Sequence, residues 1–343
     1  MKEYKVAVVG ATGMVGRKML QVLAERKFPV GELIPFASAK SAGKEIEWCG
    51  KKYTVVETNE ENIKRAAAEI VIMSAGGSAS GKFSPMFAAA GGIVIDNSAF
   101  WRMDKDVPLV VPEVNPEDAF NHPKGIIANP NCSTIQAMVA LKPLNDAFGI
   151  KRVIYTTFQA VSGAGVKGYA DLDNGMKAYA EGKSDYELQK FPRPIAGNCL
   201  PEIDILLDNG YYKEEQKMID ETHKILHAPD MKVTATCVRV PVFYGHSESV
   251  NIEFEKPASP EDVRAVLEKA PGVIVVDDPA NHGYPTALEC ADKDEVFVGR
   301  IRKDFTVDSG VNMWIVADNI RKGAATNAVQ IAQLLVGKDC NRG

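Results

Sequence analysis

The sequence predicts an α/β protein in which a doubly wound parallel sheet is followed by an α+β part built on a mostly antiparallel sheet. Three observations lead to this fold class. The chain has 343 residues, more than one hydrophobic core usually supports, so two domains are expected. Residues 5–9 form a short apolar run that opens onto a glycine-rich turn, which is typical of a parallel nucleotide-binding sheet. Beyond residue 150 the apolar runs are alternating and β-branched, as in antiparallel strands.

The composition is that of an ordinary globular protein, with 45% hydrophobic and 25% charged residues. A net charge of −5 and a pI near 5.7 argue against a general nucleic-acid or anionic-membrane binder. No apolar run approaches the roughly 18 residues of a membrane-spanning helix. Because the first residues lead directly into a strand and leave no room for a signal sequence, we expect a cytoplasmic protein.

The six cysteines are too far apart for a Cys-x-x-Cys pair; they lie at positions 49, 132, 199, 237, 290 and 340. In a cytoplasmic chain of this size the spacing favours free thiols over disulfides or structural zinc. The one metal-like spacing is His223-x-x-x-His227, which would place two imidazoles on one helix face. No third ligand lies nearby, so we interpret the pair as a solvated helix face and expect no metal.

The glycine-rich turn GATGMVG (residues 10–16) lies between the strand at 5–9 and a predicted helix at 17–26. Strand, glycine turn and helix in this order begin a Rossmann-like dinucleotide fold. Glycines let the backbone approach a pyrophosphate, and the helix N-terminus offers it N–H groups. The spacing G-x-x-G-x-x-G differs from the commoner G-x-G-x-x-G, so the motif alone is a moderate signal.

The second predicted strand, residues 32–38, ends in the sequence Ser38-Ala39-Lys40-Ser41. NAD enzymes usually present an acidic residue here to hold the ribose 2′-hydroxyl. A cation with two hydroxyls suits a 2′-phosphate instead, which favours NADP over NAD. The alternative is a solvated turn whose lysine binds nothing.

Continuous apolar runs at residues 69–76 and 91–98 predict further strands, buried on both faces of a parallel sheet. A helix is expected between them, around residues 85–90. A proline-punctuated stretch and a short apolar run at 125–129 then lead to Cys132, which therefore lies at the end of the nucleotide-binding part. The expected position of the nicotinamide is close to it.

Cys132 lies in the sequence NPNCST (residues 129–134), ahead of a predicted helix at 135–150. Turn-forming and N-capping residues surround it, so its thiol should lie at a helix N-terminus. Unpaired N–H groups and the helix dipole stabilise a thiolate there. The simpler interpretation is a thiol buried as a small hydrophobe near a helix start.

The second half of the chain contains five predicted strands and a final helix. The strands are expected at residues 152–163, 232–243, 249–256, 296–305 and 311–318, and the helix at 323–337. Together they predict the α+β part with its mostly antiparallel sheet.

If Cys132 attacks a carbonyl carbon beside a nicotinamide, addition to an aldehyde gives a tetrahedral adduct whose hydride can leave, forming a thioester. Such chemistry needs an acid or base, and His246, at a glycine-containing turn between two strands, is the best candidate. A hydrogen-bonded loop histidine is the alternative.

Four further charged residues suggest binding of an ionic substrate. Arg239 lies among apolar residues of a strand and needs an anion, either a substrate carboxylate or a structural acid. Glu214 and Lys217 share a helix face, for which the simpler interpretation is a surface ion pair. Arg102 follows two aromatic residues in a loop and has the geometry to bind phosphate.

Several stretches, in this order from residue 4 to about 335, resemble the aspartate-semialdehyde dehydrogenase family of bacterial type. They include GATGMVG, SAKSAGK, DNSAFWR, DVPLVVPEVN, NPNCSTIQ, QAVSGAG, KEEQKM, TCVRVPV and GHSESV. The resemblance implies an NADP-dependent oxidoreductase of amino-acid biosynthesis, on the route to lysine, threonine, methionine and isoleucine. The enzyme would reduce L-aspartyl-4-phosphate to L-aspartate 4-semialdehyde with release of phosphate, reversibly, through an acyl thioester.

The resemblance also implies roles for individual residues. Cys132 would be the nucleophile, His246 the proton acceptor and donor, and Gln159 the residue that orients the substrate carbonyl. Four side chains would bind the substrate: Arg239 its carboxylate, Glu214 its amino group, and Arg102 with Lys217 its phosphate. The residues expected to bind NADP are Gly10, Thr12, Gly13, Met14, Val15, Gly16, Ser38, Lys40, Ser41, Ser162, Gly163 and Asn319.

The family precedent sets the expected domains and partners. They are an NADP-binding domain at 1–131, a catalytic and dimerisation domain at 132–320, and a C-terminal helix at 321–343 that returns to the first domain. A homodimer is expected, with a tetramer as the alternative. Lys40 stands where many relatives have arginine, which weakens the grip on a 2′-phosphate and leaves some use of NAD open. Residues 167–197, which relatives use partly for subunit contacts, do not align with the family pattern.

Three rival functions differ in what they require. N-acetyl-γ-glutamyl-phosphate reductase shares the fold, the cysteine and the acyl-phosphate chemistry, but its acetylated substrate offers Glu214 no ammonium group. Glyceraldehyde-phosphate dehydrogenases have a second cysteine after the nucleophile, which this chain lacks. A catalytically silent NADP-binding regulator would bind cofactor without turnover.

Overall fold

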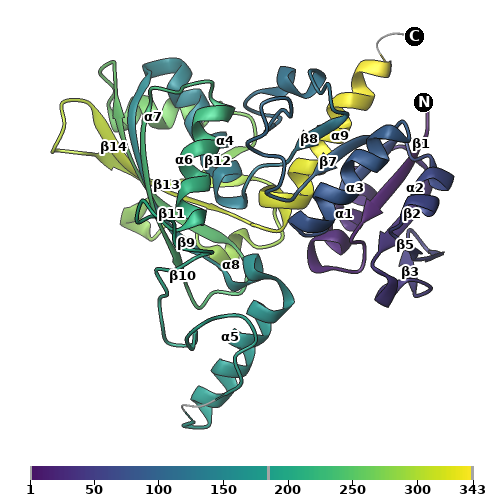
Figure 1. Ribbon diagram of the computed structural model, residues 1–343. Helices are drawn as coiled ribbons and strands as arrows, with labels where there is room; N and C mark the ends of the chain where they lie inside the picture. The colour runs from purple at the N-terminus through teal and green to yellow at the C-terminus, as the bar shows by residue number, and fades with distance from the viewer. Residues whose placement is uncertain (1, 184–185, 341–343) are drawn as a thin grey trace. The chain divides into compact units, whose positions relative to one another are not determined.

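The computed structural model describes residues 2–183 and 186–340. Contacts divide the chain into two compact units, one formed by Met1–Asn131 with Ala324–Gly343 and the other by Cys132–Gly323. Each unit contains a six-stranded sheet of its own (Figure 1).

The first unit is built on a parallel sheet with the strand order β5-β2-β1-β6-β7-β8. The strands are β1 (Tyr4–Val9), β2 (Val30–Ala37), β5 (Val56–Glu57), β6 (Ile70–Met73), β7 (Ile93–Asp96) and β8 (Ile126–Ala128). All four residues of β6 are buried, as the continuous apolar run predicted. The doubly wound parallel sheet of the predicted fold class is confirmed.

Two pairs of helices accompany this sheet. Helix α1 (Met14–Glu25) contacts α9 (Thr326–Cys340), and α2 (Glu60–Ala66) contacts α3 (Gly77–Ala89), which also packs on β6, β7 and β8. The apolar side of α9 belongs to the main hydrophobic core of the first unit, with Val329 and Ile331 fully buried beside residues of α1 and β1. The C-terminal helix is therefore part of the first unit.

In the glycine turn after β1, the backbone packs closely against other backbone segments. Gly10 has a φ of +82°, and a Cβ there would lie 2.3 Å from the carbonyl oxygen of Ser74. A Cβ on Gly16 would lie 2.1 Å from the carbonyl oxygen of Gly10. Both positions therefore require glycine. Helix α1 begins at Met14, three residues before the predicted start, with the extended Gly13 as its N-cap.

The second unit contains a mixed sheet with the order β10-β9-β11-β14-β13-β12. Its strands are β9 (Ile150–Gln159), β10 (Lys232–Arg239), β11 (His246–Phe254), β12 (Val273–Val275), β13 (Val296–Lys303) and β14 (Gly310–Ala317). The three central pairs are antiparallel, and the pair at each edge is parallel. The five predicted strands of this part are thus present, and β12 is an additional short edge strand.

Helices cover one side of this sheet. Helix α4 (Cys132–Phe148) packs on β9, β11, β13 and β14, and it is flanked by α6 (Lys213–Ile225) and α7 (Pro260–Leu267) (Figure 1). Nine consecutive residues of α4, from Ser133 to Leu141, are buried. The N-terminal end of α4 is therefore held rigidly against the sheet.

The segment that did not align with the family pattern contains α5 (Gly165–Ala180) and a following loop. Buried Asp171 of α5 organises this loop, because its carboxylate accepts three backbone N–H groups, from Gln189, Lys190 and Phe191, at 2.7–2.9 Å. Residues 184 and 185 of this segment lie outside the described part of the chain. The remaining elements of the second unit are the short helix α8 (Ala287–Cys290) and the 3-10 turns η3 (Val161–Ala164) and η4 (Pro279–Asn281), while the π-helix η5 (Arg321–Ala325) spans the boundary between the two units in the sequence.

Several local predictions were wrong. Helix α4 begins at Cys132 and ends at Phe148, because Gly149 adopts a φ of +68° and Ile150 already starts β9. The predicted face bearing His223 and His227 does not exist. Helix α6 ends at Ile225, and His227 has a φ of +51°, so the two imidazoles are not one turn apart on a helix.

The first unit also contains elements that were not predicted. They are the strand β5, the helix α2, the turns η1 (Ala39–Ser41) and η2 (Pro116–Phe120), and a two-stranded hairpin, β3 (Glu45–Trp48) with β4 (Lys51–Thr54). Cys49 and Gly50, the two turn residues of the hairpin, both have positive φ, as a two-residue hairpin turn of type I′ requires.

Candidate active site

The N-terminus of α4 holds Cys132, which is half-buried in the second unit. Cys132 is the first residue of the helix, so its thiol lies at the positive end of the helix dipole, where a thiolate is stabilised. Gly323 packs directly behind it, and a Cβ on that glycine would lie 2.9 Å from Cβ of Cys132. Any larger residue at position 323 would push the cysteine out of place.

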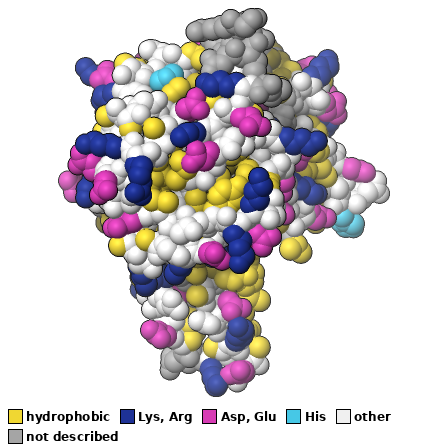
Figure 2. Space-filling model, turned by 90° about the vertical axis from the view of Figure 1, so that its right-hand side faces the viewer, with side chains coloured by type: hydrophobic (Ala, Val, Ile, Leu, Met, Phe, Trp, Pro, Cys, Tyr) yellow, Lys and Arg dark blue, Asp and Glu magenta, His cyan; other side chains and the backbone are white. Residues whose placement is uncertain are grey.

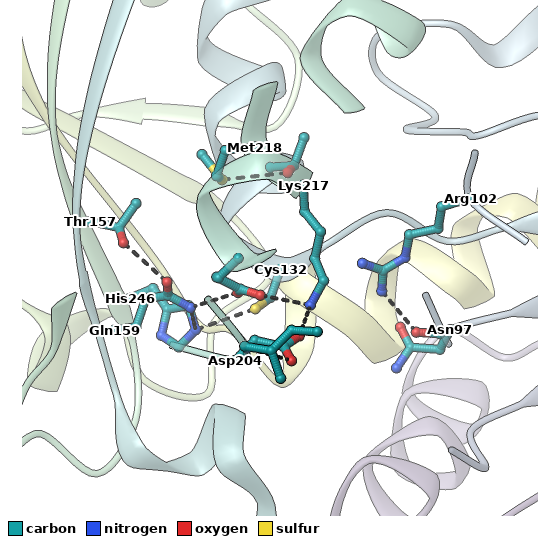
Figure 3. Close-up of polar contacts among 12 residues, drawn as sticks. Asn97, Arg102, Cys132, Thr157, Gln159, Asp204, Lys217, Met218 and His246 are labelled. Atoms are coloured by element: carbon teal, nitrogen blue, oxygen red, sulfur yellow. Dashed lines mark hydrogen bonds and ion pairs between the residues drawn. The ribbon is translucent and has the colours of Figure 1, made fainter. Parts of the chain in front are cut away.

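His246 is a polar partner of this thiol. Its Nε2 lies 3.3 Å from Sγ of Cys132 (Figure 3). The imidazole is completely buried at the first position of β11. Its Nδ1 accepts a hydrogen bond from the backbone N–H of Ala160 at 3.0 Å. Because Nδ1 accepts, the proton of the neutral ring is on Nε2, so His246 presents an N–H and not a lone pair to the sulfur.

The surroundings of His246 keep it neutral. Burial, and secondarily the positive charge of Arg239, lower the pKa of His246 to about 3, while Glu214 opposes this shift. The imidazole is therefore uncharged throughout the neutral range, and the donor role of Nε2 persists there.

Gln159 connects the histidine to an acidic group. It is the last residue of β9 and is buried. Its Nε2 lies 3.4 Å from Nε2 of His246 and donates to Oε1 of Glu214 at 3.1 Å, while its Oε1 accepts from the hydroxyl of Thr157 at 3.0 Å. The orientation of the amide is thereby fixed.

Glu214 and Lys217 are not a surface pair. Glu214 is buried, and Nζ of Lys217 donates to its Oε2 at 3.0 Å and to Oδ2 of Asp204 at 2.8 Å (Figure 3). Burial lowers the pKa of Lys217, but the charges and hydrogen bonds of Glu214 and Asp204 outweigh it, so the pKa lies above its ordinary value. Lys217 is therefore a charged, nearly buried ammonium group between two carboxylates.

Sequence reasoning missed Asp204. The residue lies in a loop with a φ of +73°, a conformation that costs energy for any residue other than glycine, and its carboxylate also accepts from the backbone N–H of Ile205 at 3.0 Å. Only its position in the stretch EIDILLDN, before KEEQK, offered a signal in the sequence.

Arg239 is a buried cation at the end of β10, with 5% of its surface exposed. Its Nη1 donates to the carbonyl oxygen of Ala160 at 2.7 Å, and its guanidinium lies over the ring of Phe191. Burial lowers its pKa, opposed by the charges of Glu214 and Cys132. In the described parts of the chain it forms no ion pair with a carboxylate, so a structural acid does not neutralise it.

Three predicted cofactor residues also belong to this region. A Cβ on Gly163 would lie 3.0 Å from Nη1 of Arg239 and 3.3 Å from the imidazole of His246. Asn319 donates to the hydroxyl of Ser162 at 3.0 Å, and its Oδ1 accepts from the backbone N–H of Gly245 at 3.0 Å. The turn that precedes His246 is thus tied to Ser162 and Asn319.

The first unit contains a cavity of about 640 Å³ at the carboxyl ends of β1, β2 and β6. Four residues predicted to bind the cofactor line it: Gly10, Thr12, Gly13 and Ser38. The glycine turn beside it has no side chains that would obstruct a pyrophosphate, and the N-terminus of α1 points its N–H groups there. These features fit a dinucleotide.

The other residues predicted for this part of the cofactor site do not line the cavity. Met14, Val15 and Gly16 belong to the first turn of α1, while Lys40 and Ser41 lie in η1. Glu57, Glu60 and Lys82 do line it and were not predicted.

Arg102 belongs to the first unit and is buried. Its Nε donates to the carbonyl oxygen of Asn129 and its Nη2 to that of Asn97, both at 3.0 Å (Figure 3). These contacts hold the guanidinium on the loops that follow β7 and β8. The other charged candidates, Glu214, Lys217 and Arg239, belong to the second unit.

On the face shown in Figure 2, basic and acidic side chains are interspersed and do not gather into a patch of one sign. None of the helices within residues 2–183 and 186–340 is long and apolar enough to cross a membrane. In the same residues, no group of three or more His, Cys, Asp or Glu side chains is arranged to hold a metal ion. The five cysteines whose side chains are described are free.

Comparison with protein families matches both halves of the chain. Residues 5–122 match the semialdehyde dehydrogenase NAD-binding domain, and residues 141–322 match the semialdehyde dehydrogenase dimerisation domain. The chain belongs to the semialdehyde dehydrogenase family. The resemblance and the prediction of an oxidoreductase with a nicotinamide-cofactor domain are confirmed.

Named relatives and solved structures of this family cover nearly the whole chain. Aspartate-semialdehyde dehydrogenases from Aquifex aeolicus and Campylobacter jejuni are 60% and 52% identical to it, over 97% of this chain and 98% and 97% of theirs. Aspartate semialdehyde dehydrogenase II from Vibrio cholerae, solved also in complex with ASA, has 49% identity and a TM-score of 0.94 over 98% of this chain and 99% of that chain. The Candida albicans enzyme, solved with NADP, has 29% identity and a TM-score of 0.77, over 98% and 99% of the two chains.

Proposed function

We propose that this semialdehyde dehydrogenase catalyses the reversible, NADPH-dependent conversion of L-aspartyl-4-phosphate to L-aspartate 4-semialdehyde and phosphate. The observation that carries the proposal is the contact of 3.3 Å between Sγ of Cys132 and Nε2 of His246, in the unit that also holds the buried Arg239. An acyl phosphate with a free carboxylate requires a nucleophilic thiol and a hydrogen-bond donor beside it. It also requires a buried cation that has no carboxylate partner within the protein.

Cys132 acts as the nucleophile in this proposal. Its thiolate attacks the acyl carbon, the C–O bond to phosphate breaks, and a thioester forms. Nε2–H of His246 donates a hydrogen bond to the sulfur, and then to the oxygen of the tetrahedral adduct that forms at the same carbon. When bound, the cofactor supplies the hydride that reduces the thioester. In the tautomer set by the N–H of Ala160, His246 stabilises negative charge and does not abstract a proton through Nε2.

The substrate groups are assigned by charge. Arg239 binds the α-carboxylate with a planar, two-pronged guanidinium. Glu214 binds the ammonium group, and Gln159, which bonds to Glu214, orients the reacting carbonyl. Lys217 and Arg102 bind the phosphate. Because the buried Arg239 forms no ion pair with a described carboxylate, a substrate without an α-carboxylate would leave its charge unpaired, which makes the site selective.

NADP is the proposed cofactor, and it is supported by the cavity of about 640 Å³ beside the glycine turn. Gly10, Thr12 and Gly13 accommodate the pyrophosphate, and Ser38, with the adjoining Lys40 and Ser41, faces the ribose 2′-phosphate. Ser162, Gly163 and Asn319 are proposed to contact the nicotinamide end. Glu57 and Glu60, which line the same cavity, would repel a 2′-phosphate, so some activity with NAD is expected.

We also propose that the chain acts in the cytoplasm as a homodimer, with 1–131 and 321–343 as the NADP-binding part and 132–320 as the catalytic and dimerisation part. The match of residues 141–322 to the dimerisation-domain model supports the dimer.

Steady-state kinetics test the function directly. Purified protein should reduce NADP in the presence of aspartate semialdehyde and phosphate, and should use NAD less well. In the reverse direction it should prefer aspartyl phosphate to N-acetyl-γ-glutamyl phosphate, because an acetylated amine offers the carboxylate of Glu214 no positive charge. Preference for the acetylated compound would refute the substrate assignment, and cofactor binding without turnover would refute the enzyme.

A further inference from the structure

Glu248 is a fully buried acidic residue that the proposed mechanism does not use. It lies on β11 two residues after His246, with 0% of its surface exposed. In the described parts of the chain neither of its carboxyl oxygens has a hydrogen-bond partner, and the same is true of Oε1 of Gln136. An ionised carboxylate without a partner in the protein interior would be very costly, so this arrangement needs a physical explanation.

Strand and helix geometry bring Glu248 and Gln136 together. Alternate residues of a strand point to the same face, so His246 and Glu248 both face α4. Cys132 and Gln136 are one turn apart on α4, about 6 Å along its axis, which nearly equals the spacing of about 7 Å between alternate residues of a strand. Gln136 on the helix therefore lies beside Glu248 on the strand, in the same way that Cys132 lies beside His246.

Gln136 also contacts the histidine itself. Its Nε2 donates to the backbone carbonyl oxygen of His246 at 3.3 Å. With Nε2 engaged in this way, the other atom of the amide, Oε1, is an acceptor that lacks a donor, next to a carboxyl group that also lacks one. One proton placed between the two groups satisfies both.

The charges around Glu248 favour that proton. Burial raises the pKa of Glu248 well above its ordinary value, and the only opposing influence is the neighbouring side-chain amide of Gln136. The titratable groups that interact with it are Tyr155 on β9 and Cys237 on β10. Burial raises the pKa of each, so both are neutral. No described cation is near enough to stabilise the ionised form of the carboxyl.

We propose that Glu248 is a neutral carboxylic acid that donates its proton to Oε1 of Gln136 and thereby positions His246 against Cys132. The chain of contacts runs from Glu248 to the side chain of Gln136 and from there to the backbone of His246. It also joins α4, which begins with the thiol, to the strand that begins with the imidazole. Glu248 is thus a positioning residue, and the inference rests on the proposed roles of Cys132 and His246.

Infrared spectroscopy tests the protonation state directly. The difference spectrum between wild type and Glu248→Gln, at neutral pH, should contain the C=O band of one protonated carboxylic acid that the variant lacks. A difference spectrum with only carboxylate bands would overturn the proposal. This measurement does not depend on any assay of turnover.

Kinetics test the positioning role. Glu248→Leu keeps the size of the side chain but removes the donor, so kcat should fall by roughly one to two powers of ten, because a displacement of about 1 Å costs on that order. KM should change by less than about threefold, since no substrate-binding group is altered. Glu248→Gln retains a donor and should recover most of the lost kcat. Glu253→Leu, on the same strand but bonded to exposed Lys151, is the matched control and should keep the wild-type kcat.

Three outcomes would refute the role of Glu248 while wild type remains active. They are an unchanged kcat in Glu248→Leu, a kcat in Glu248→Gln as low as in Glu248→Leu, and additive losses when Glu248→Leu is combined with Gln136→Leu. Failure of the proposed function itself would show differently, as an inactive wild-type protein. Denaturant midpoints of each variant separate lost positioning from lost folding.

Discussion

The backbone N–H of Ala160 donates to Nδ1 of His246 at 3.0 Å. The carbonyl oxygen of Ala160 accepts from Nη1 of Arg239 at 2.7 Å. One residue at the end of β9 therefore fixes both the tautomer of the imidazole and the position of the guanidinium. Because the backbone makes both contacts, the side chain at position 160 plays no part in them.

The tautomer predicts how the protein responds to loss of the imidazole. His246→Ala should lower kcat by roughly two to three powers of ten, the usual worth of one donor to a developing oxyanion. Because the pKa of His246 is about 3, kcat/KM of wild type should show no titration near pH 6.5 that the variant lacks. A wild-type acid limb near that pH, absent from the variant, would mean that the imidazole acts as a base.

The same pKa predicts an effect on stability. The unfolded chain takes up a proton on His246 near pH 6.5, whereas the folded protein does so only near pH 3. The contribution of the neutral ring is therefore complete above about pH 6.5 and is lost as pH falls toward about 3. Denaturation measures the unfolding free energies of wild type and His246→Asn at about pH 8 and about pH 5. Between these two pH values the unfolding free energy of wild type should fall by more than that of the variant. No shift would show that the ring is protonated in the folded state.

Cys132→Ala should abolish turnover and leave NADP binding within a few-fold of wild type. Iodoacetamide should modify Cys132 faster than the exposed Cys49 and Cys199, because only Cys132 lies at a helix N-terminus. Peptide mapping after partial alkylation measures the order. Equal modification of the three thiols would contradict a stabilised thiolate.

Arg239→Lys keeps the charge but removes the planar fork. KM for aspartate semialdehyde should rise roughly tenfold to a hundredfold, the worth of one charge-assisted hydrogen bond. Arg65→Lys, on the exposed surface of α2, serves as the control. If KM is unchanged in Arg239→Lys, the arginine serves only to hold the carbonyl of Ala160.

Asp204→Asn removes one of the two carboxylates that hold Lys217. If Lys217 binds phosphate, the carboxylate of Asp204 competes with phosphate for its ammonium group. Removing this competitor should lower KM for phosphate about two- to fivefold, because partly exposed ion pairs contribute up to about 1 kcal/mol. KM for aspartate semialdehyde should stay near its wild-type value. A higher KM for phosphate would show instead that Asp204 positions the lysine.

Local patterns were sufficient to predict much of the site. The strand and glycine turn of the first unit, the helix that carries Glu214 and Lys217, and the placement of Cys132 at a helix start all follow from short stretches of sequence. These features depend on backbone preferences that act within one or two turns.

The features that escaped prediction depend on tertiary contacts. Helix α3 begins at Gly77, within a glycine- and serine-rich stretch of low helix propensity, and it is held there because Ser80 and Ser84 donate to buried Asp96 of β7. The strands of the hairpin of β3 and β4 are only four residues long, and their few apolar residues, such as Ile46 and Trp48, are half-buried by packing on the core of the first unit. Asp204 adopts its positive φ beside Lys217, and neither fact is visible in the sequence.

The place of α9 in the core of the first unit bears on how the protein is made. Synthesis on the ribosome proceeds from the N-terminus, and the segment from Ala324 onward emerges after the whole second unit. Until it does, the apolar residues of α1 and β1 that α9 covers remain exposed. The second unit, which is contiguous in sequence, can therefore fold before the first is complete. A nascent chain that stalls before α9 emerges exposes this apolar surface to chaperones.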